Sequence, residues 1–120
     1  MSRPVHFEIL AEHPEAVAAF YQRVFGWTTN TWTGGQQSYW LVNTGPDGTM
    51  GINGGIMHRH FPQAISLTMA VESLDETAAN IETAGGKKIQ GPDEIPGVGL
   101  HAYFKDPDGN IFGVLQPIMK

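Results

Sequence analysis

The chain contains no cysteine, and its basic residues are few and scattered. Its 120 residues include 7 Lys and Arg against 12 Asp and Glu, which gives a net charge of −5. Because the chain has no thiol, it can form no disulfide, no thiolate nucleophile and no cysteine-ligated zinc site. Because binding to a phosphate backbone depends on clustered cations, nucleic acid is not expected as a partner.

Long apolar runs are also missing. No stretch reaches the roughly 18 apolar residues of a membrane span, and the first residues lack the apolar segment of a signal peptide. We therefore expect no membrane partner and a cytoplasmic location. The sequence also lacks a G-x-G-x-x-G motif and a P-loop, so no nucleotide cofactor is expected. The length and the hydrophobic fraction of 41% are typical of a single globular domain with a buried core.

Hydrophobic patterning predicts the same order of elements twice. In the first half, a strand at 5–10 precedes a helix that begins at Pro14 and ends at Gly26, followed by strands at 27–32, 37–43 and 50–57. The apolar stripe of the helix is formed by Val17, Phe20, Tyr21 and Val24. Glycines 51, 54 and 55 in the last strand indicate a bulge or the close approach of a ligand or backbone.

In the second half, a strand at 65–71 precedes a helix opened by the capping box of Ser73 and Glu76. Three strands follow, at 87–90, 99–105 and 111–116. The Pro-Asp-Gly turns at Asp47 and Asp108 are 61 positions apart, and the two helix openings are 60 apart. A near-constant offset across helices and turns is the signature of a duplicated unit. The sequence therefore predicts an α+β fold of two tandem βαβββ modules, about residues 5–57 and 65–117 of one domain spanning 1–120.

Three passages resemble the glyoxalase / bleomycin-resistance / extradiol dioxygenase (vicinal oxygen chelate) superfamily. The first runs from the strand at 6–9 through Pro14 and Glu15 to the helix end at 19–21 and 25–27. The others are the segment Gly-Gly-Ile-Met at 54–57 and the closing turn and strand at 105–113. The second passage is similar to a subgroup related to lactoylglutathione lyase. The resemblance implies a glyoxalase-like fold, in which the modules form a curled mixed sheet around a cavity. It also implies a homodimer.

Metal-dependent members of that superfamily place four ligands on cavity-facing strands, and the resemblance puts the first of them on His6. The corresponding positions in the other strands are Ser66, Gly113 and the segment 52–54, which offer no further set of ligands. Since one imidazole does not hold a divalent ion against water, we expect no metal and no cofactor. The pair His58 and His60 has metal-ligand spacing, but a solvated loop is the favoured interpretation because no third donor is near.

Glu8 and His6 are the candidate catalytic residues. They share one face of the first strand, while Phe7 and Ile9 belong against the helix. A carboxylate on an inward face costs free energy unless it is paired or hydrogen-bonded. Such a placement is typical of a group that transfers protons. The alternative is a structural role, in which Glu8 bonds to Ser66 or Thr68 on a neighbouring strand.

The candidate ligand-binding residues are polar or aromatic side chains on strands of both modules: Trp40, Ser66, Thr68, His101 and Tyr103. Aromatic groups that line a cavity suit a flat organic ligand. The strand alternation does not decide which face is inside, so His101, Tyr103 and Trp40 also fit outer-face packing or an interface.

These observations predict a glyoxalase-like protein that binds a small organic molecule and acts as a metal-independent lyase or isomerase. The alternative is a non-catalytic, drug- or metabolite-sequestering protein of the bleomycin-resistance type. An accessory subunit with a vestigial pocket is a third interpretation.

Overall fold

The computed structural model describes residues 2–32 and 38–118 and confirms the α+β fold of two tandem βαβββ modules. The first module consists of β1 (Arg3–Ala11), α1 (Pro14–Phe25), β2 (Thr28–Trp32), β3 (Tyr39–Asn43) and β4 (Asn53–His58). The second consists of β5 (Ile65–Ala70), α2 (Leu74–Thr83), β6 (Lys87–Ile95), β7 (Gly99–Lys105) and β8 (Ile111–Pro117). Residues 6–66 form one compact unit, and residues 1–5 with 67–120 form the other.

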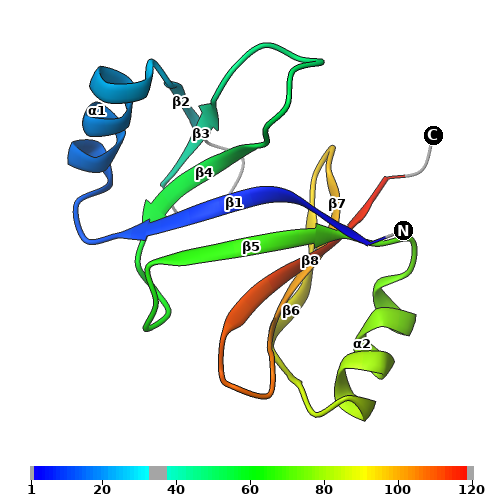
Figure 1. Ribbon diagram of the computed structural model, residues 1–120. Coiled ribbons are helices and arrows are strands. Elements are labelled where there is room, and N and C mark those ends of the chain that lie inside the picture. The colour runs from blue at the N-terminus through cyan, green and yellow to red at the C-terminus, as the bar shows by residue number, and fades with distance from the viewer. Residues whose placement is uncertain (1, 33–37, 119–120) are drawn as a thin grey trace. The chain divides into compact units, whose positions relative to one another are not determined.

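The first module is a four-stranded mixed sheet in the order β2-β3-β4-β1 (Figure 1). β1 runs parallel to β4, and its residue Glu8 pairs with Gly55. β3 runs antiparallel to β4, and its residue Leu41 pairs with the same glycine. Gly55 therefore lies between β1 and β3, and this register positions the site described below.

The core of the first module lies between its sheet and α1. Val42, Ile56 and Ala18 are its buried members. Phe7 and Ile9 pack against them, which confirms the prediction that this face of β1 meets the helix. Because successive strand residues point to opposite faces, His6 and Glu8 lie on the other side of β1.

Helix α1 begins and ends where the sequence predicts, and only part of its predicted stripe meets the core. Pro14 occupies the first turn, and Gly26 caps the C-terminus with φ of 76°, a left-handed conformation that favours glycine. Ala18 is buried, whereas Phe20 and Val24 of the predicted stripe are 56% and 55% exposed. Val17 of the predicted stripe packs against the core and Tyr21 is half-buried, so the prediction is right for these two residues and wrong for Phe20 and Val24. Helical periodicity does not say which side of a broad apolar surface meets the sheet.

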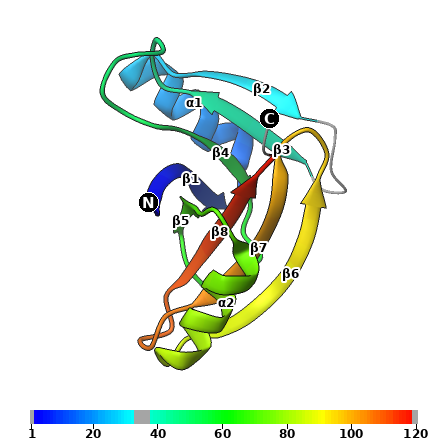
Figure 2. The ribbon, with the colours of Figure 1, turned by 90° about the vertical axis from the view of Figure 1, so that its right-hand side faces the viewer.

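The second module has the equivalent strand order, β5-β8-β7-β6, with β5 parallel to β8 (Figure 2). Its core contains Phe104, Val114 and Leu74, with Ala78 and Ile81 of α2 packed against them. The predicted capping box holds at its first residue, because the Ser73 hydroxyl accepts a hydrogen bond of 3.1 Å from the Glu76 amide. The internal duplication is thus present in the strand pairing as well as in the element order.

The turn between β7 and β8 is closed by one carboxylate. Asp106 accepts hydrogen bonds from the side-chain amide of Asn110 at 3.0 Å and from the backbone amides of Asp108 and Asn110, each at 2.9 Å. The Asn110 side chain is the main cause that lowers the pKa of Asp106, with the backbone donors adding to it. The Asp-Pro-Asp-Gly-Asn sequence therefore serves as a self-contained turn.

The helices are short. Within the part of the chain that the structure describes, no helix has the length and the apolar content that crossing a membrane requires.

Candidate functional site

Three polar side chains of the first module are joined by hydrogen bonds. The hydroxyl of Tyr39 on β3 donates to the Oε2 atom of Glu8 on β1 at 3.1 Å. The same hydroxyl oxygen lies 2.7 Å from the Nε2 atom of His6. Glu8 is only 6% exposed, so its carboxylate depends on such bonds to remain inside the protein. Tyr39 therefore links the two predicted catalytic residues into one hydrogen-bonded group, in which Glu8 is buried and the other two residues are half-buried.

Gly55 makes this contact possible. Tyr39 must cross β4 to reach β1, and it does so at Gly55, which pairs with Glu8. A Cβ atom at residue 55 would overlap the Tyr39 hydroxyl and ring. The glycine thus leaves open the space that the phenol occupies, as the sequence indicated for a strand glycine.

The hydrogen positions of the group follow from its chemistry. A phenol has one hydroxyl hydrogen, and Tyr39 directs it to the Glu8 carboxylate, which only accepts. The 2.7 Å contact with His6 then requires a hydrogen on Nε2, so we assign His6 to this tautomer. Burial lowers the pKa of His6 below its ordinary value of 6.5, while the nearby Glu8 opposes this effect. The lowered pKa favours the neutral imidazole at pH 7.

The second module has an equivalent cluster. Thr68 on β5 and Tyr103 on β7 both pair with Gly113 on β8, as Glu8 and Leu41 pair with Gly55. A Cβ atom at residue 113 would lie 2.7 Å from the Nε2 atom of His101 and 2.9 Å from the Oγ1 atom of Thr68. The rings of His101 and Tyr103 meet edge to face, with centroids 4.6 Å apart. Three of the predicted ligand-binding residues are thus brought together.

Trp40 requires a correction. It packs against the core formed by Ala18, Val42 and Ile56, on the opposite face of β3 from Tyr39. By strand pairing, Tyr39 is the equivalent of His101, since each precedes by two residues the partner of the glycine. The repeat offset is 62 here, rather than the 61 of the turns, and a shift of one residue reverses the face of a strand.

The remaining predicted residues lie on β5, at the end of β4 and in the loop that follows it. Ser66 on β5 is 2% exposed. His58 and His60 lie at the end of β4 and in the following loop, and both are exposed. The ring of His60 contacts Phe61, and that of His58 contacts Trp40.

The donor set does not fit a metal of the kind the resemblance implies. Gly55 and Gly113 offer no side-chain donor, and the Nε2 atom of His6 faces the Tyr39 hydroxyl. Among residues 2–32 and 38–118, no three His, Cys, Asp or Glu side chains are grouped so that they could hold an ion. We therefore derive no step through a metal.

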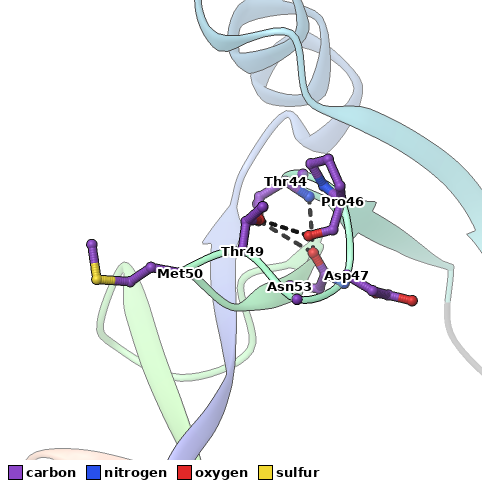
Figure 3. Close-up of a pocket in the computed structure, with 9 residues that line it drawn as sticks. Thr44, Pro46, Asp47, Thr49, Met50 and Asn53 are labelled. Atoms are coloured by element: carbon purple, nitrogen blue, oxygen red, sulfur yellow. Dashed lines mark hydrogen bonds between the residues drawn. The ribbon is translucent and has the colours of Figure 1, made fainter.

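A separate hollow of about 160 Å³ lies on the turn between β3 and β4 (Figure 3). The Thr44 amide and hydroxyl donate to the Asn53 side-chain oxygen, and the Thr49 hydroxyl donates to the Pro46 carbonyl. Met50 points away from the hollow and is fully exposed. The hollow is smaller than the roughly 300–1,000 Å³ of a typical ligand site and contains none of the predicted site residues. We interpret it as part of the turn.

Sequence reasoning missed Tyr39 and did not link Gly55 to it. The signal was Gly55, which pairs with the buried Glu8 on one side and with Leu41 on the other. Tyr39, a long polar side chain, lies two residues before Leu41. That signal depends on the strand pairing, which alternation alone does not supply.

The lowered pKa of His6 predicts a pH-dependent stability. The unfolded chain takes up a proton below pH 6.5 more readily than the folded protein. The contribution of His6 to the free energy of unfolding should therefore be fully present above pH 6.5. It should be lost as the pH drops below this value, by at most about 1.4 kcal/mol per pH unit. Urea unfolding at pH 7.5 and 5.5 should show a smaller loss for His6→Gln than for the wild type. The exposed-site control His58→Gln should match the wild type, and equal losses in all three proteins would contradict the assignment.

The Gly55 contact predicts a position-specific effect of one methyl group. Gly55→Ala should displace Tyr39 and lower the free energy of unfolding by about 1–3 kcal/mol, because the added atom has no free space. Gly45→Ala is the matched control, since its Cβ atom would meet only the Thr49 hydroxyl, at 3.8 Å. Chemical denaturation measures both. A Gly55→Ala protein as stable as the control would show that the phenol does not occupy this space.

Curated relatives match most of this chain, and the chain spans less than half of their length. "Putative glyoxylase CFP32" of Mycobacterium tuberculosis is 36% identical over 114 residues, which cover 92% of this chain and 42% of that protein. "Anthracycline biosynthesis protein DnrV" of Streptomyces peucetius is 26% identical over 134 residues, with 92% and 46% covered.

Solved structures show the same fold at low sequence identity. Methylmalonyl-CoA epimerase from Mycobacterium tuberculosis has a TM-score of 0.71 at 12% identity, covering 97% of this chain and 88% of that one. A methylmalonyl-CoA epimerase in complex with methylmalonyl-CoA and NH4+ has a TM-score of 0.66 at 15% identity, covering 96% and 94%. The family model described as Glyoxalase/Bleomycin resistance protein/Dioxygenase superfamily matches residues 3–114. The chain belongs to this superfamily.

Proposed function

We propose that this protein binds a small organic molecule and catalyses a proton transfer on it without a metal ion, as an isomerase or lyase. The observation that carries the proposal is the buried carboxylate of Glu8, hydrogen-bonded through Tyr39 to the neutral imidazole of His6. A carboxylate is the form of Glu8 that accepts a proton, and general-base catalysis requires such a group at the reacting atom. Glu8 is the base in this proposal, and His6 supports it.

The solved relatives support an isomerase over other activities. Methylmalonyl-CoA epimerases share the fold, and one of them is in complex with methylmalonyl-CoA. Epimerisation at a carbon next to a carbonyl group proceeds by removal and return of a proton, which a carboxylate base can perform. The sequence identity to these enzymes is only 12–15%, and the groups of this chain that support the activity are its own His6, Tyr39 and Glu8.

The second module has a cluster of its own that could hold polar groups of a ligand. Thr68 and Tyr103 are 3% and 7% exposed, and His101 lies beside them. Hydroxyl and imidazole groups donate hydrogen bonds to carbonyl or carboxylate oxygens. We assign these three residues to a polar cluster that binds carbonyl or carboxylate oxygens within the second module.

A homodimer and a cytoplasmic location complete the proposal. The exposed apolar surface of α1 supports the dimer, because Phe20, Val24 and Phe25 are each more than half exposed there. Contiguous exposed apolar side chains on a small protein often mark an interface.

Glu8→Gln tests the catalytic role. With methylmalonyl-CoA and a panel of small carbonyl compounds in D2O, the wild type should incorporate deuterium into at least one compound. Glu8→Gln should slow this exchange on the order of 10²–10⁴-fold, because an amide does not accept the proton. The exposed-site control Glu12→Gln and addition of EDTA should leave the rate unchanged.

Two results would contradict the proposal. Exchange by Glu8→Gln at the wild-type rate would remove Glu8 as the base. Tight binding of a compound, seen by tryptophan fluorescence, with no exchange in any compound of the panel would favour the sequestering alternative.

A further inference from the structure

The Tyr39 hydroxyl lies between two side chains of β1 that are themselves potential metal ligands. Its oxygen atom is 2.7 Å from the Nε2 atom of His6 and 3.1 Å from the Oε2 atom of Glu8. An imidazole nitrogen makes a hydrogen bond and binds a metal ion along the same direction, because both interactions use its one in-plane position. The phenol oxygen therefore lies where an ion would approach His6.

The hydrogen on the Nε2 atom has the same effect. A histidine binds a metal ion only through a ring nitrogen that carries no hydrogen. His6 uses Nε2 as a donor to Tyr39, in the tautomer assigned above. While the phenol is in place, this nitrogen is therefore not available as a ligand.

A side chain at residue 55 and the phenol of Tyr39 exclude each other. Gly55 pairs with Glu8, and residues paired on neighbouring strands point to the same face of a sheet. A side chain on β4 at this position would therefore point toward the same group, and its Cβ atom would overlap the Tyr39 hydroxyl. The first module has room either for a further ligand from β4 or for the phenol from β3. Its sequence supplies the glycine and the phenol.

The second module repeats this exclusion with other residues. Gly113 on β8, one of the positions on which the resemblance places a metal ligand, is the equivalent of Gly55. A Cβ atom at residue 113 would lie 2.7 Å from the Nε2 atom of His101, which is closer than Cβ atoms come to other atoms in proteins. His101, like Tyr39, lies two residues before the glycine's partner on the neighbouring antiparallel strand. In both modules, a ring from that strand fills the space of a ligand side chain.

We propose that the phenol of Tyr39 takes the place of the metal ion that the resemblance implies, as the positioning residue of this site. It holds the imidazole of His6 and the carboxylate of Glu8 together by hydrogen bonds, where an ion would hold them by coordination. The inference concerns how the site is assembled, so it stands or falls separately from the proposed proton transfer. Removing the phenol frees both donors, and a third donor at residue 55 then completes a set of two imidazoles and one carboxylate, which binds zinc in catalytic sites.

Building that donor set tests the proposal. Tyr39→Ala combined with Gly55→His removes the phenol and adds an imidazole beside the two freed donors. Every protein in the series, including the parent, carries His58→Gln and His60→Gln, so that the exposed histidine pair contributes no metal binding. We expect this variant to bind one Co²⁺ ion more than about 100-fold more tightly than the parent, because losing even a residue that only supports a metal ligand costs about 10–100-fold in affinity. Isothermal titration measures the affinity, and the visible absorption of Co²⁺ reports its coordination.

Two controls are matched to this variant. Adding Glu8→Gln removes one of the three donors and should return the affinity to that of the parent. Tyr39→Ala with Gly45→His places the new imidazole in the exposed turn and should bind Co²⁺ no better than Tyr39→Ala alone. Circular dichroism shows whether each protein is folded. A folded Tyr39→Ala, Gly55→His protein with the affinity of the parent would overturn the proposal, and so would tight binding of Co²⁺ by the parent that His6→Gln abolishes.

A second measurement needs no added ligand and decides the proposal if the combined variant does not fold. Long-range ¹⁵N NMR spectra of histidine-labelled protein report which ring nitrogen of His6 carries the hydrogen. The proposal requires the Nε2–H tautomer in the wild type, with a signal that Zn²⁺ leaves unchanged, and a Zn²⁺-dependent shift of Nε2 in Tyr39→Ala. Tyr21→Phe, which removes another phenol of the same module, should behave as the wild type.

The contradicting results leave the proposed function open to its own test. A wild-type His6 with its hydrogen on Nδ1, or with a Nε2 signal that Zn²⁺ shifts, would show that the phenol does not hold this nitrogen and would overturn the inference. Glu8 would remain the proposed base, which the deuterium exchange of Glu8→Gln decides independently.

Discussion

The hydroxyl of Tyr39 is the group on which the rest of the first module's site depends. It bonds to a buried carboxylate on one side and to a neutral imidazole on the other, and it reaches both over a glycine. A charged side chain with so little exposure is stable only when donors surround it. The sheet register brings one such donor, the Tyr39 hydroxyl, to Glu8. The strand pairing places Gly55 directly between Glu8 and the strand that carries Tyr39.

Duplication explains why the second module has a similar cluster with different chemistry. Gly113 occupies the position of Gly55, His101 that of Tyr39, and Thr68 that of Glu8. The backbone arrangement is the same, whereas the carboxylate is present only in the first module's version of these positions.

The fold and half of the site could be predicted from the sequence for a physical reason. Turn residues, a capping box and alternation are local signals, and the paired modules repeated them at a nearly constant spacing. Alternation also placed Glu8 and His6 on one face of β1, which the packing of Phe7 and Ile9 against the core confirms. The choice between Tyr39 and Trp40 depended on a pairing register, and an error of one residue was enough to select the face that packs against the core. Phe20 and Val24 show the same limit on α1.

The central claim is that Tyr39 and Glu8 act as one hydrogen-bonded unit. A double-mutant cycle on the free energy of unfolding tests it most directly, with Tyr39→Phe, Glu8→Gln and the double variant measured by urea denaturation. The account predicts that the two single effects do not add, with a coupling energy of about 0.5–3 kcal/mol, whereas Tyr21→Phe combined with Glu8→Gln is additive. Additive effects for the Tyr39 and Glu8 pair would contradict the account.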